Sequence, residues 1–513
     1  AFVKRTSPDK LVTITTKSGK KITATEYHPL FVLKNGKIRS IKSEELKEGE
    51  RIALPRNLSI DIKNKIFYEL LDKIKFKDLI YVPYSNDTFS KIKIKKWIQV
   101  SKETEIPYLA LKSYRDKQSI NFEYLVKLLR YNNLTDDEII SCIPYVKSKN
   151  GNVKYKLPWK NSPELARLFG YLLAEGRLTD SGQIWFTNGK ENIVKDYHQL
   201  IQGIFDLRAT VNEYKENCWD VIAYSTPIIT FFRKLGMDKT INKEIKNIFL
   251  KNSSKEELWE LINGLYSGDG YVSKNSIEIV TKSPKLAKDI ETIFLRLDII
   301  TNTRDIIKIA TNSGFSGKYK QVSIYGTNNF QKFKENVNFV HEMKKERIEN
   351  YKPKKINPNN DLIEINSLVK NIANNLNINI KKTKKEYPRL DSYCYNQCTP
   401  SRVGVQQMLT LFKTKSTQQT EEMKQLELFG NSDIFWDEII SVEKKQSEEK
   451  WVYDLCVEKD HNFIANNIIV HNSNVLDSLC FVLGRGSAKS LRAEKSSNLI
   501  YNGGKAKKPA KDG

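Results

Sequence analysis

Cysteine is scarce in this sequence, and the six cysteines are scattered over positions 142, 218, 394, 398, 456 and 480. So few cysteines in a chain of 513 residues show no pattern of a disulfide framework. Cys394 and Cys398 have no second pair of ligands nearby, so a zinc site is the less favoured alternative there. No signal-peptide pattern and no long apolar run is visible. These absences predict a reduced, cytoplasmic protein with no membrane partner.

Acidic residues are fewer than basic ones, because 61 Asp and Glu stand against 85 Lys and Arg, a formal net charge of +24. Such an excess favours a polyanionic partner, most simply nucleic acid. The alternative is an AT-rich coding sequence that favours Lys, Asn and Ile throughout. Hydrophobic residues make up 39% of the 513 residues and aromatic residues 10%, enough for several folded domains.

The most informative stretch is the apolar run 468–470 that leads into His471, Asn472 and Ser473. An imidazole, a carboxamide and a hydroxyl thus follow one another. The Asn472 side-chain nitrogen can attack its own backbone carbonyl and close to a succinimide, which breaks the bond to Ser473 if His471 protonates the leaving group. Ser473 can in turn carry an acyl chain. Three such residues also occur in ordinary polar loops, so the sequence around them decides.

The residues before this junction predict a strand at 452–457, followed by residues 460–465 and the junction strand, a β-hairpin that ends at the scissile bond. The block VYDLCVEKDHNFIANNIIVHN followed by Ser resembles the C-terminal splicing block of inteins. The resemblance implies cyclisation of Asn472 and transesterification onto Ser473, aided by other groups of the block, namely His471, His461 and Asp454.

The beginning of the chain predicts two strands, at 11–16 and 21–25, joined by a turn and followed by His28. This stretch resembles the intein block with a Thr-x-x-His pair. The resemblance implies that Thr25 and His28 polarise the peptide at the upstream junction. The Cys or Ser nucleophile of that junction is expected several tens of residues earlier, so we expect the chain to be a fragment or one half of a split protein. Its expected partners are then the missing N-terminal intein segment and the upstream extein.

Two predicted helices end in a carboxylate followed by glycine, at Glu175 and at Asp269. Each helix carries small residues four apart, which let two backbones approach closely, at Gly170 and Ala174 and at Gly264 and Gly268. A carboxylate at a helix C-terminus faces the negative end of the helix dipole and needs a compensating cation. Two such ends in contact predict a divalent-metal site with hard oxygen ligands, suited to Mg²⁺.

The doubled motif resembles the LAGLIDADG homing endonucleases, and this implies cleavage of double-stranded DNA at the intein-less host-gene site by two pseudo-symmetric αββαββα-like halves. The resemblance also assigns assisting lysines to Lys243 and to Lys344 or Lys345, with plain surface lysines as the alternative. Two departures stand out: the first acid is Glu175 rather than Asp, and Lys246 replaces a usual Pro. The Glu moves its oxygens, so an inactive remnant that only binds DNA is the alternative function.

The segments around the motifs are less informative. Residues 57–160 predict helices at 65–71 and 122–130, and residues 97–115 have the spacing of a helix-turn-helix, with a plain helical spacer as the equal alternative. Residues 351–430 are expected to form an accessory DNA-recognition module, with a packing subdomain as the alternative.

Strands of the endonuclease halves are predicted at 184–188 and 321–326, and a helix at 288–295. The strands are expected to form a saddle on DNA whose polar side chains contact phosphates and major-groove edges.

Residues 473–513 change in character and contain NVLDSLCFVLGRG followed by SAKSLRAE. They resemble the N-terminal ATPase head of structural maintenance of chromosomes (SMC) proteins, beginning at the Ser of the phosphate-binding loop. The resemblance implies a nucleoid-associated host that binds ATP and Mg²⁺ only after splicing, when Ser473 becomes a Mg²⁺ ligand. An ATPase activity of this chain itself is disfavoured, since the Gly-rich loop and Lys do not precede that Ser.

These blocks together predict a multidomain chain in which a β-rich Hint fold is interrupted by an α+β LAGLIDADG endonuclease. The predicted boundaries are 1–56 and 431–472 for the splicing domain, 57–160 for an insert, 161–350 for the endonuclease, 351–430 for the accessory module and 473–513 for the C-extein.

Overall fold

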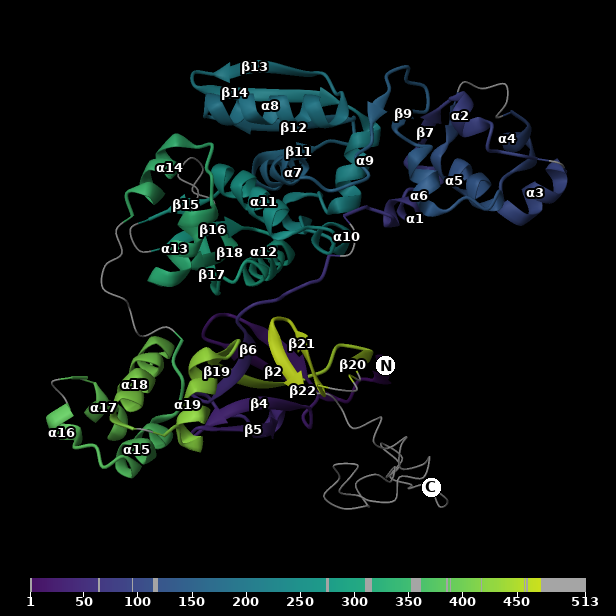
Figure 1. Cartoon of the computed structure of the whole chain (residues 1–513). Helices are drawn as coiled ribbons and strands as arrows, with labels where there is room; N and C mark the ends of the chain where they lie inside the picture. Colours follow the sequence, from purple (N-terminus) through teal and green to yellow (C-terminus); the bar gives the residue numbers. More distant parts are fainter. Residues whose placement is uncertain are drawn as a thin grey trace, which may run out of the picture. The chain divides into compact units, whose positions relative to one another are not determined.

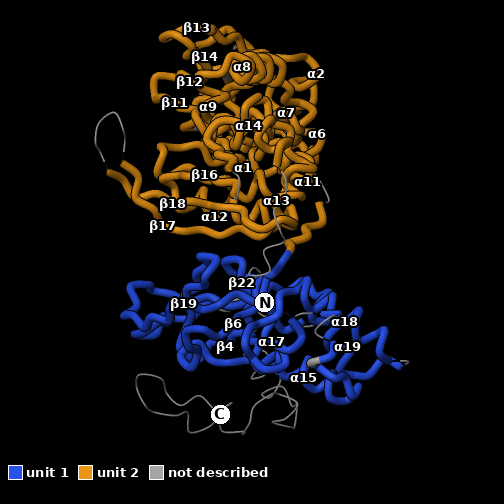
Figure 2. Tube along the Cα trace, turned by 90° about the vertical axis from the view of Figure 1, so that its left-hand side faces the viewer, with its two compact units in different colours: residues 1–56, 357–513 blue, residues 57–356 orange. Residues whose placement is uncertain are grey.

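The computed structural model describes residues 2–62, 65–94, 96–113, 119–273, 276–309, 316–351, 361–383, 386–387, 389–416, 418–455, 457 and 460–471. The chain divides into two compact units, one of residues 1–56 with 357–513 and one of residues 57–356 (Figure 2). The position 56/57 is also the predicted boundary between the splicing segment 1–56 and the insert 57–160, whereas unit 1 resumes at 357 and the second splicing segment is predicted from 431.

Unit 1 is built on an eight-stranded sheet, and both predicted splicing segments, at the beginning of the chain and after residue 431, contribute strands to it (Figure 1). Its strand order is β21-β22-β4-β6-β19-β2-β3, with β5 paired to β4. The strands are β2 (Lys10–Thr16), β3 (Lys21–Ala24), β4 (Pro29–Lys34), β5 (Lys37–Lys42), β6 (Arg51–Pro55), β19 (Ile434–Gln446), β21 (Asn462–Ala465) and β22 (Ile468–His471). The first part of β19 pairs with β6 and the rest with β2, so one strand connects the two ends of the sheet.

Two tight hairpins of this sheet follow from their turn residues. Asn35 and Gly36 both have positive φ, 53° and 70°, between β4 and β5. Asn466 and Asn467 have φ of 51° and 61° between β21 and β22. Two residues with positive φ form the type I′ turn, whose twist matches that of the flanking strands. The second hairpin fixes the register in which His471 faces Asn462.

The strand before this hairpin differs from the prediction. β20 (Trp451–Leu455) pairs with β1 (Phe2–Thr6) and lies outside the hairpin that ends at the junction. The hairpin consists of β21 and β22 alone. The alternation of residues 452–457 predicts a strand but not its partner, which is more than 400 positions away in the sequence.

Helices after residue 360 belong to unit 1 and pack on its sheet. They are α15 (Asn366–Asn375), α16 (Ile380–Thr383), α17 (Leu390–Cys394), α18 (Arg402–Lys415) and α19 (Glu421–Asn431). Their buried side chains form one cluster with Leu33, Ala53 and Trp436 of the strands. The helices therefore share a core with the strands of the sheet, and the role of residues 351–430 in DNA recognition stays a prediction.

Unit 2 contains two modules with the same order of elements. The first consists of α7 (Pro163–Glu175), β11 (Gly176–Leu178), β12 (Gln183–Asn188), α8 (Glu191–Phe205), β13 (Ala209–Lys215), β14 (Cys218–Tyr224) and α9 (Thr226–Leu235). The second consists of α11 (Lys255–Gly268), β15 (Tyr271–Val272), β16 (Ile277–Thr281), α12 (Pro284–Arg296), β17 (Thr301–Ile309), β18 (Ser316–Ile324) and α13 (Thr327–Asn336). The sheet orders, β11-β12-β14-β13 and β15-β16-β18-β17, correspond strand by strand.

Serine caps begin the two central helices. The Ser162 hydroxyl oxygen accepts a hydrogen bond from the backbone N–H of Leu165, and Pro163 occupies the first turn of α7. Ser254 and Glu257 form a reciprocal capping box at α11. These caps satisfy amides that no residue of the helix itself can pair.

Residues 57–160 do not form a separate domain. They contain a sheet of order β10-β9-β7-β8, made of β7 (Ile80–Pro83), β8 (Ser119–Asn121), β9 (Tyr145–Ser148) and β10 (Tyr155–Lys156), and the helices α1 (Glu69–Lys73), α2 (Asn86–Phe89), α3 (Trp97–Thr104), α4 (Tyr108–Ser113), α5 (Phe122–Tyr131) and α6 (Asp136–Ser141). Their buried residues share one core with the modules, as in the ring contacts of Phe67 with Phe231 and Phe249. The helix predicted at 65–71 begins only at Glu69.

Every helix in the described part of the chain is too short or too polar to span a bilayer.

Candidate functional site

Helices α7 and α11 of unit 2 pack with their backbones in contact. A Cβ on Gly170 would lie 2.2 Å from the carbonyl oxygen of Leu261, and a Cβ on Gly264 would lie 2.2 Å from that of Arg167. Only glycine permits this approach. The contact aligns the two helices so that their C-terminal ends lie side by side.

Glu175 and Asp269 meet at these ends. A Cβ on Gly268 would lie 3.7 Å from the carboxyl carbon of Glu175. Burial raises the pKa of Glu175 to about 7, a hydrogen bond from Asn188 opposes the rise, and the charge of Asp269 adds to it. Burial likewise raises the pKa of Asp269 to about 6, against the positive charges of Lys243 and Lys344. Both carboxyl groups therefore carry a cost of ionisation that a bound cation would relieve.

The residue after each carboxylate must be glycine, because a side chain there would overlap the preceding helical turn. Gly176 has an extended backbone, φ −79° and ψ 149°, and not the left-handed conformation of a common helix stop. A Cβ on Gly176 would lie 2.6 Å from the Leu172 carbonyl oxygen, and a Cβ on Gly270 2.6 Å from that of Tyr266. The chain turns so sharply after each carboxylate that it passes against the preceding helical turn.

Two lysines bind the ends of the two helices in the same way. The ammonium group of Lys243 donates to carbonyl oxygens at the end of α7, those of Leu172 (3.2 Å), Leu173 (2.8 Å) and Gly176 (3.1 Å). That of Lys344, on α14 (Glu342–Glu349), donates to carbonyl oxygens at the end of α11, those of Tyr266 (2.8 Å), Ser267 (2.8 Å) and Gly268 (2.7 Å). Each lysine therefore neutralises the negative end of one helix beside a carboxylate.

Burial lowers the pKa of Lys243 and of Lys344 to about 8, although both carboxylates act to raise it. Lys345 is exposed on α14. Of the two residues that the sequence left open, Lys344 is therefore the one at the helix ends. Neither Lys243 nor Lys344 fits the alternative of a solvated surface lysine.

The two carboxylates fit a hard cation whose remaining coordination positions are filled by ligands from outside the protein. Glu175 and Asp269 supply carboxylate oxygens, and no group of three or more His, Cys, Asp or Glu side chains suited to a metal occurs among the residues described. Mg²⁺ commonly binds through one or two carboxylates and takes water and substrate phosphates for the rest. The Cys394 thiol is instead buried with its pKa raised to about 11, which disfavours the thiolate that zinc needs.

Asn188 is a site residue that the sequence did not single out. It ends β12, and its side-chain amide donates to one carboxylate oxygen of Glu175. The sequence signal is weak, since it consists of one polar residue at the end of a predicted strand. This hydrogen bond holds the Glu175 carboxylate in place.

A second cluster lies in unit 1, where β22 pairs with β4 through Val470 and Leu30. The pairing places the His471 ring 5.3 Å from the ring of Phe31, measured between centroids. Burial lowers the pKa of His28, the charge of Asp454 raises it, and His471 lowers it. The charges of Asp454 and His471 thus act on His28, although the three residues come from separate segments of the chain.

The loop that carries His28 is held on both sides. The amide of His28 donates to the carbonyl oxygen of buried Thr25 at 3.0 Å. The carbonyl oxygen of His28 accepts from the Ser43 amide at 2.9 Å and from its hydroxyl at 2.7 Å. The main chain therefore presents His28 in one position.

His461 comes directly before Asn462, the register partner of His471, and has a positive φ of 53°. It thus lies at the start of the hairpin whose other strand ends at the junction. Asn472 and Ser473, the predicted splicing residues, lie outside the described residues.

Comparison with known families and proteins gives the following matches. The family model for the intein splicing domain matches residues 1–472. A glutamine–fructose-6-phosphate aminotransferase of Methanocaldococcus jannaschii is 26% identical over 92% of this chain and 42% of its own length. The replication factor C small subunit of the same organism is 26% identical over 82% of this chain and 21% of its own length. The replicative DNA helicase DnaB of a Synechocystis species is 27% identical over 61% of this chain and 37% of its own length. The chain thus spans less than half the length of each of these relatives.

Among solved structures, mesophilic variants of the homing endonuclease I-DmoI overlap 34% of this chain and 94% of that chain, with 15% identity and a TM-score of 0.26. Full-length DUF199/WhiA overlaps 54% of this chain and 89% of that chain, with 14% identity and the same TM-score. Likeness at this level does not by itself assign a fold.

Proposed function

The chain belongs to the intein splicing family, and from this we propose that it excises itself from a precursor and joins the flanking segments. The observation that carries the proposal is the pairing of β22, the strand that leads into Asn472, with β4. It places the His471 ring beside that of Phe31, three residues after His28. Protonatable groups on both sides of a junction are what two coupled acyl-transfer steps need.

In the proposed reaction the Ser473 hydroxyl attacks the ester or thioester held by the upstream Cys or Ser nucleophile, takes over its acyl chain and releases that side chain as the free alcohol or thiol. The Asn472 carboxamide nitrogen then attacks the Asn472 carbonyl carbon, a succinimide ring closes, and the bond to the Ser473 nitrogen breaks. His471, next to that bond, supplies the proton that the leaving nitrogen takes. Once the Ser473 nitrogen is free, it attacks the Ser473 ester, and the acyl chain moves from oxygen to nitrogen to form the peptide bond. His28 has a lowered pKa and is neutral near pH 7, so it can accept a proton or hydrogen-bond at the upstream junction together with Thr25.

The relatives support an inserted element. An aminotransferase, a replication factor subunit and a helicase are unrelated by name, yet each matches this chain over only part of its own length. An insertion that moves among host genes accounts for this pattern. We propose residues 473–513, which lie outside the described residues, as the start of an SMC-type ATPase host that is restored by splicing.

Mass spectrometry of the purified chain tests this proposal. The wild-type chain is expected to release residues 473–513, and Asn472→Ala is expected to abolish release because the cyclising carboxamide is gone. Asn336→Ala, on the surface of α13, is the matched control and should release the piece as wild type does. Release that persists in Asn472→Ala would show that the junction is assigned wrongly.

For unit 2 we propose a homing endonuclease of the LAGLIDADG type that cuts double-stranded DNA at the uninterrupted host gene. The repeated arrangement of helix end, carboxylate and lysine carries this proposal. A bound Mg²⁺ supplies Lewis-acid stabilisation of charge on the phosphate. Glu175 and Asp269 would hold the cation, and Asn188 orients Glu175. The ammonium groups of Lys243 and Lys344, each bonded to three carbonyl oxygens, place a fixed positive charge beside the two carboxylates.

The two sheets are the proposed DNA-contacting surfaces. On the second sheet, Arg304 donates to the Gln321 side chain at 2.9 Å, and Gln321 donates to Glu278. On the first sheet, the Arg177 guanidinium lies 4.9 Å from the centre of the Trp185 ring. Gln321 is buried and holds the Arg304 side chain, and arginine is the side chain that most often recognises base edges in the major groove.

The alternative of a DNA-binding remnant without cleavage is favoured by one observation. One oxygen of Glu175 accepts a hydrogen bond from Asn188, which leaves less of that carboxylate for a cation. Cleavage of a plasmid that carries the uninterrupted junction, in the presence of Mg²⁺, separates the two functions. Binding without cleavage by the wild-type chain would establish the remnant.

A further inference from the structure

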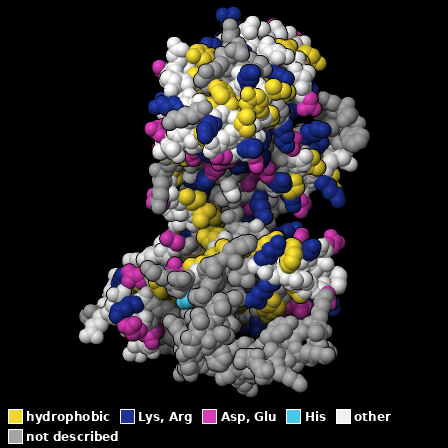
Figure 3. All heavy atoms as spheres, turned by 90° about the vertical axis from the view of Figure 1, so that its right-hand side faces the viewer, with side chains coloured by type: hydrophobic (Ala, Val, Ile, Leu, Met, Phe, Trp, Pro, Cys, Tyr) yellow, Lys and Arg dark blue, Asp and Glu magenta, His cyan; other side chains and the backbone are white. Residues whose placement is uncertain are grey.

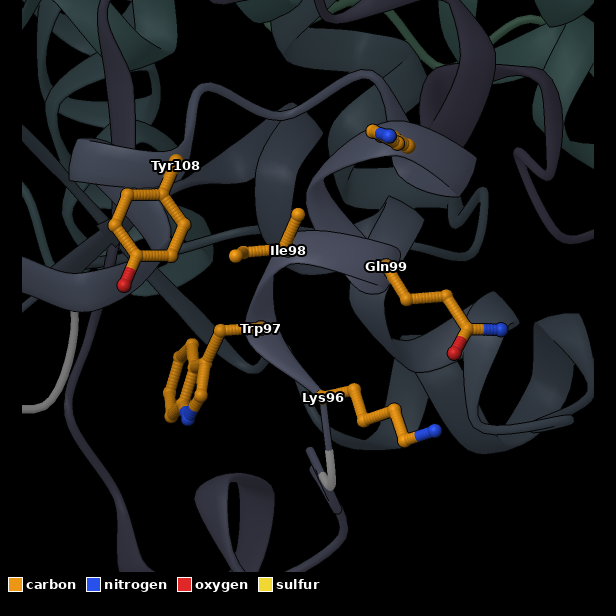
Figure 4. A pocket seen from close by; sticks show the side chains of 6 residues that line it. Lys96, Trp97, Ile98, Gln99 and Tyr108 are labelled. Carbon is orange, nitrogen blue, oxygen red and sulfur yellow. The ribbon is translucent and has the colours of Figure 1, made fainter.

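A groove between α3 and α4 lies outside both sites. It has a volume of about 580 Å³ and is lined by Lys96, Trp97, Ile98, Gln99, Lys102 and Tyr108. Figure 4 shows Ile98 directed toward the Tyr108 ring with Trp97 beside them, while Lys96 and Gln99 extend away from this apolar part. The groove thus combines an apolar side with a basic, hydrogen-bonding side.

The lining is rich in hydrogen-bond donors. Lys96, Lys102, Gln99, Tyr108 and Trp97 all carry N–H or O–H groups, and no carboxylate lines the groove. Of the acidic side chains nearby in sequence, Glu103 accepts a hydrogen bond at 2.8 Å from Gln99, which lines the groove, and Glu105 lies 3.7 Å from Lys127. The positive charge that the groove presents to a ligand is therefore that of Lys96 and Lys102. A surface of this kind fits an anionic ligand.

The groove also exposes large apolar side chains. Ile98 is 65% exposed, Tyr108 42% and Leu109, next to it on α4, 77%. Figure 3 looks onto the face of unit 2 that lies at the right in Figure 1, where α3 and α4 are labelled, and shows hydrophobic side chains grouped among Lys and Arg. Exposed apolar groups next to lysines suit a ligand with alternating anionic and apolar parts, which is the character of a sugar-phosphate backbone.

We infer that the α3–α4 groove binds the backbone of double-stranded DNA as a second contact, separate from the two sheets. The inference rests on the proposed DNA-cleaving function and adds a contact region to it. Lys96 and Lys102 contact phosphates, and Ile98 and Tyr108 pack against deoxyribose. The proposed contact is with the backbone alone and carries no sequence information. The last two residues of the predicted helix-turn-helix, 114 and 115, lie outside the described residues.

The salt dependence of DNA binding tests the inference. A fluorescein-labelled duplex of random sequence is titrated with the full chain by anisotropy at several salt concentrations, which makes the measurement independent of the cleavage site. Lys96→Gln with Lys102→Gln is expected to make the slope of log affinity against log salt shallower by about 1.8, since each lost phosphate contact removes about 0.9. The exposed lysines Lys37 and Lys42 of β5, changed to Gln, give the same loss of charge as a control and should leave the slope near that of wild type.

The outcomes separate the inference from the function on which it rests. An unchanged slope in the double variant, with tight binding by the wild-type chain, would overturn the groove contact and leave the endonuclease intact. Wild-type binding that shows no salt dependence would remove the DNA function itself. A slope changed equally by the control pair would mean that net charge and not this groove acts. Ile98→Ala, which keeps all charges, should weaken binding without changing the slope.

Discussion

At the scale of single residues, the account depends on Lys243 and Lys344. Because lysine is so common in this sequence, the resemblance named Lys243 but left Lys344 and Lys345 as alternatives. The structure places the ammonium groups of Lys243 and Lys344 each on three carbonyl oxygens at one helix end. The two carboxylates, in contrast to the lysines, could be identified from the sequence pattern. Glu175 and Asp269 could be predicted together, because each follows a helix with small residues four apart.

The neighbouring lysines on α14 provide a matched pair of variants. Lys344→Gln is expected to reduce the rate of DNA cleavage by about 100-fold, because it removes a fixed positive charge beside Glu175 and Asp269. Lys345→Gln should change the rate by less than about twofold, because its side chain is exposed. Single-turnover cleavage of the plasmid measures both, and equal rates for the two variants would argue against the assignment of Lys344.

The raised pKa values of Glu175 and Asp269 give cation binding a pH dependence. Ca²⁺ affinity, measured by calorimetry, is expected to rise from pH 5 to pH 8, since a cation binds the ionised carboxylates and their pKa values are about 7 and about 6. Affinity that does not vary with pH would place the cation elsewhere. Asp269→Asn should remove the binding.

In the metal-free protein the same raised pKa values make the folded state less stable as pH rises. The pKa of each carboxyl group is higher in the folded than in the unfolded chain, so its contribution to stability is present below the unfolded pKa and is lost as pH rises through the folded one. Ca²⁺ should therefore raise the unfolding temperature more at pH 8 than at pH 5, with Asp269→Asn as the control.

At the scale of elements, glycine at the crossing of α7 and α11 is decisive. Gly264→Ala is expected to destabilise unit 2 by about 3 kcal/mol, since its methyl group would overlap a backbone carbonyl. Gly203→Ala on α8 is the control, because no atom lies within 4 Å of its added Cβ, and there Ala should stabilise by about 1 kcal/mol. Urea unfolding followed by circular dichroism measures both, and a neutral Gly264→Ala would mean that the helices do not cross here.

The helices of residues 361–431 are joined to the sheet of unit 1 by buried ions. The Asp361 carboxylate pairs with Arg56, at the end of β6, and with Arg402. The distance from Arg402 Nε to an oxygen of Asp361 is 2.8 Å. Arg402 also donates to carbonyl oxygens before and within β19, among them that of Phe429 at 2.7 Å. The two places where the chain leaves and re-enters unit 1 are thus held together.

Asp361→Asn tests this connection. It is expected to lower the free energy of unfolding of unit 1 by about 3 kcal/mol, because Arg402 would keep a buried charge without a counter-ion. Glu427→Gln, which removes an exposed pair with Lys413, should cost less than about 1 kcal/mol. Guanidinium titration of the two variants decides, and similar losses would mean that the pair is not the connection.

The elements also differ in how well the sequence predicts them. Helix α5 and the strands β2 and β3 follow from periodicity and from turn residues such as Gly19, with φ of 85°. The pairing of β20 with β1 and the packing of α15 to α19 on the sheet depend on contacts between distant segments, which periodicity does not encode.

At the scale of the whole molecule, the two proposed activities lie in different units of the chain. The sequence predicts this division, because the intein blocks flank the doubled helix motif. It does not predict that residues 57–160 share a core with the modules, because that core is built from apolar residues that look alike in any helical segment.

The most direct test of the account follows both reactions in one sample. A plasmid with the uninterrupted junction is incubated with Mg²⁺ and the wild-type, Glu175→Gln, Asp269→Asn or Asn472→Ala chain, and DNA cleavage and release of residues 473–513 are both measured. We expect the two carboxylate variants to lose cleavage and keep release, and Asn472→Ala to lose release and keep cleavage. Loss of both activities in any of these variants, or cleavage by Glu175→Gln or Asp269→Asn, would contradict two separate sites in one inserted element.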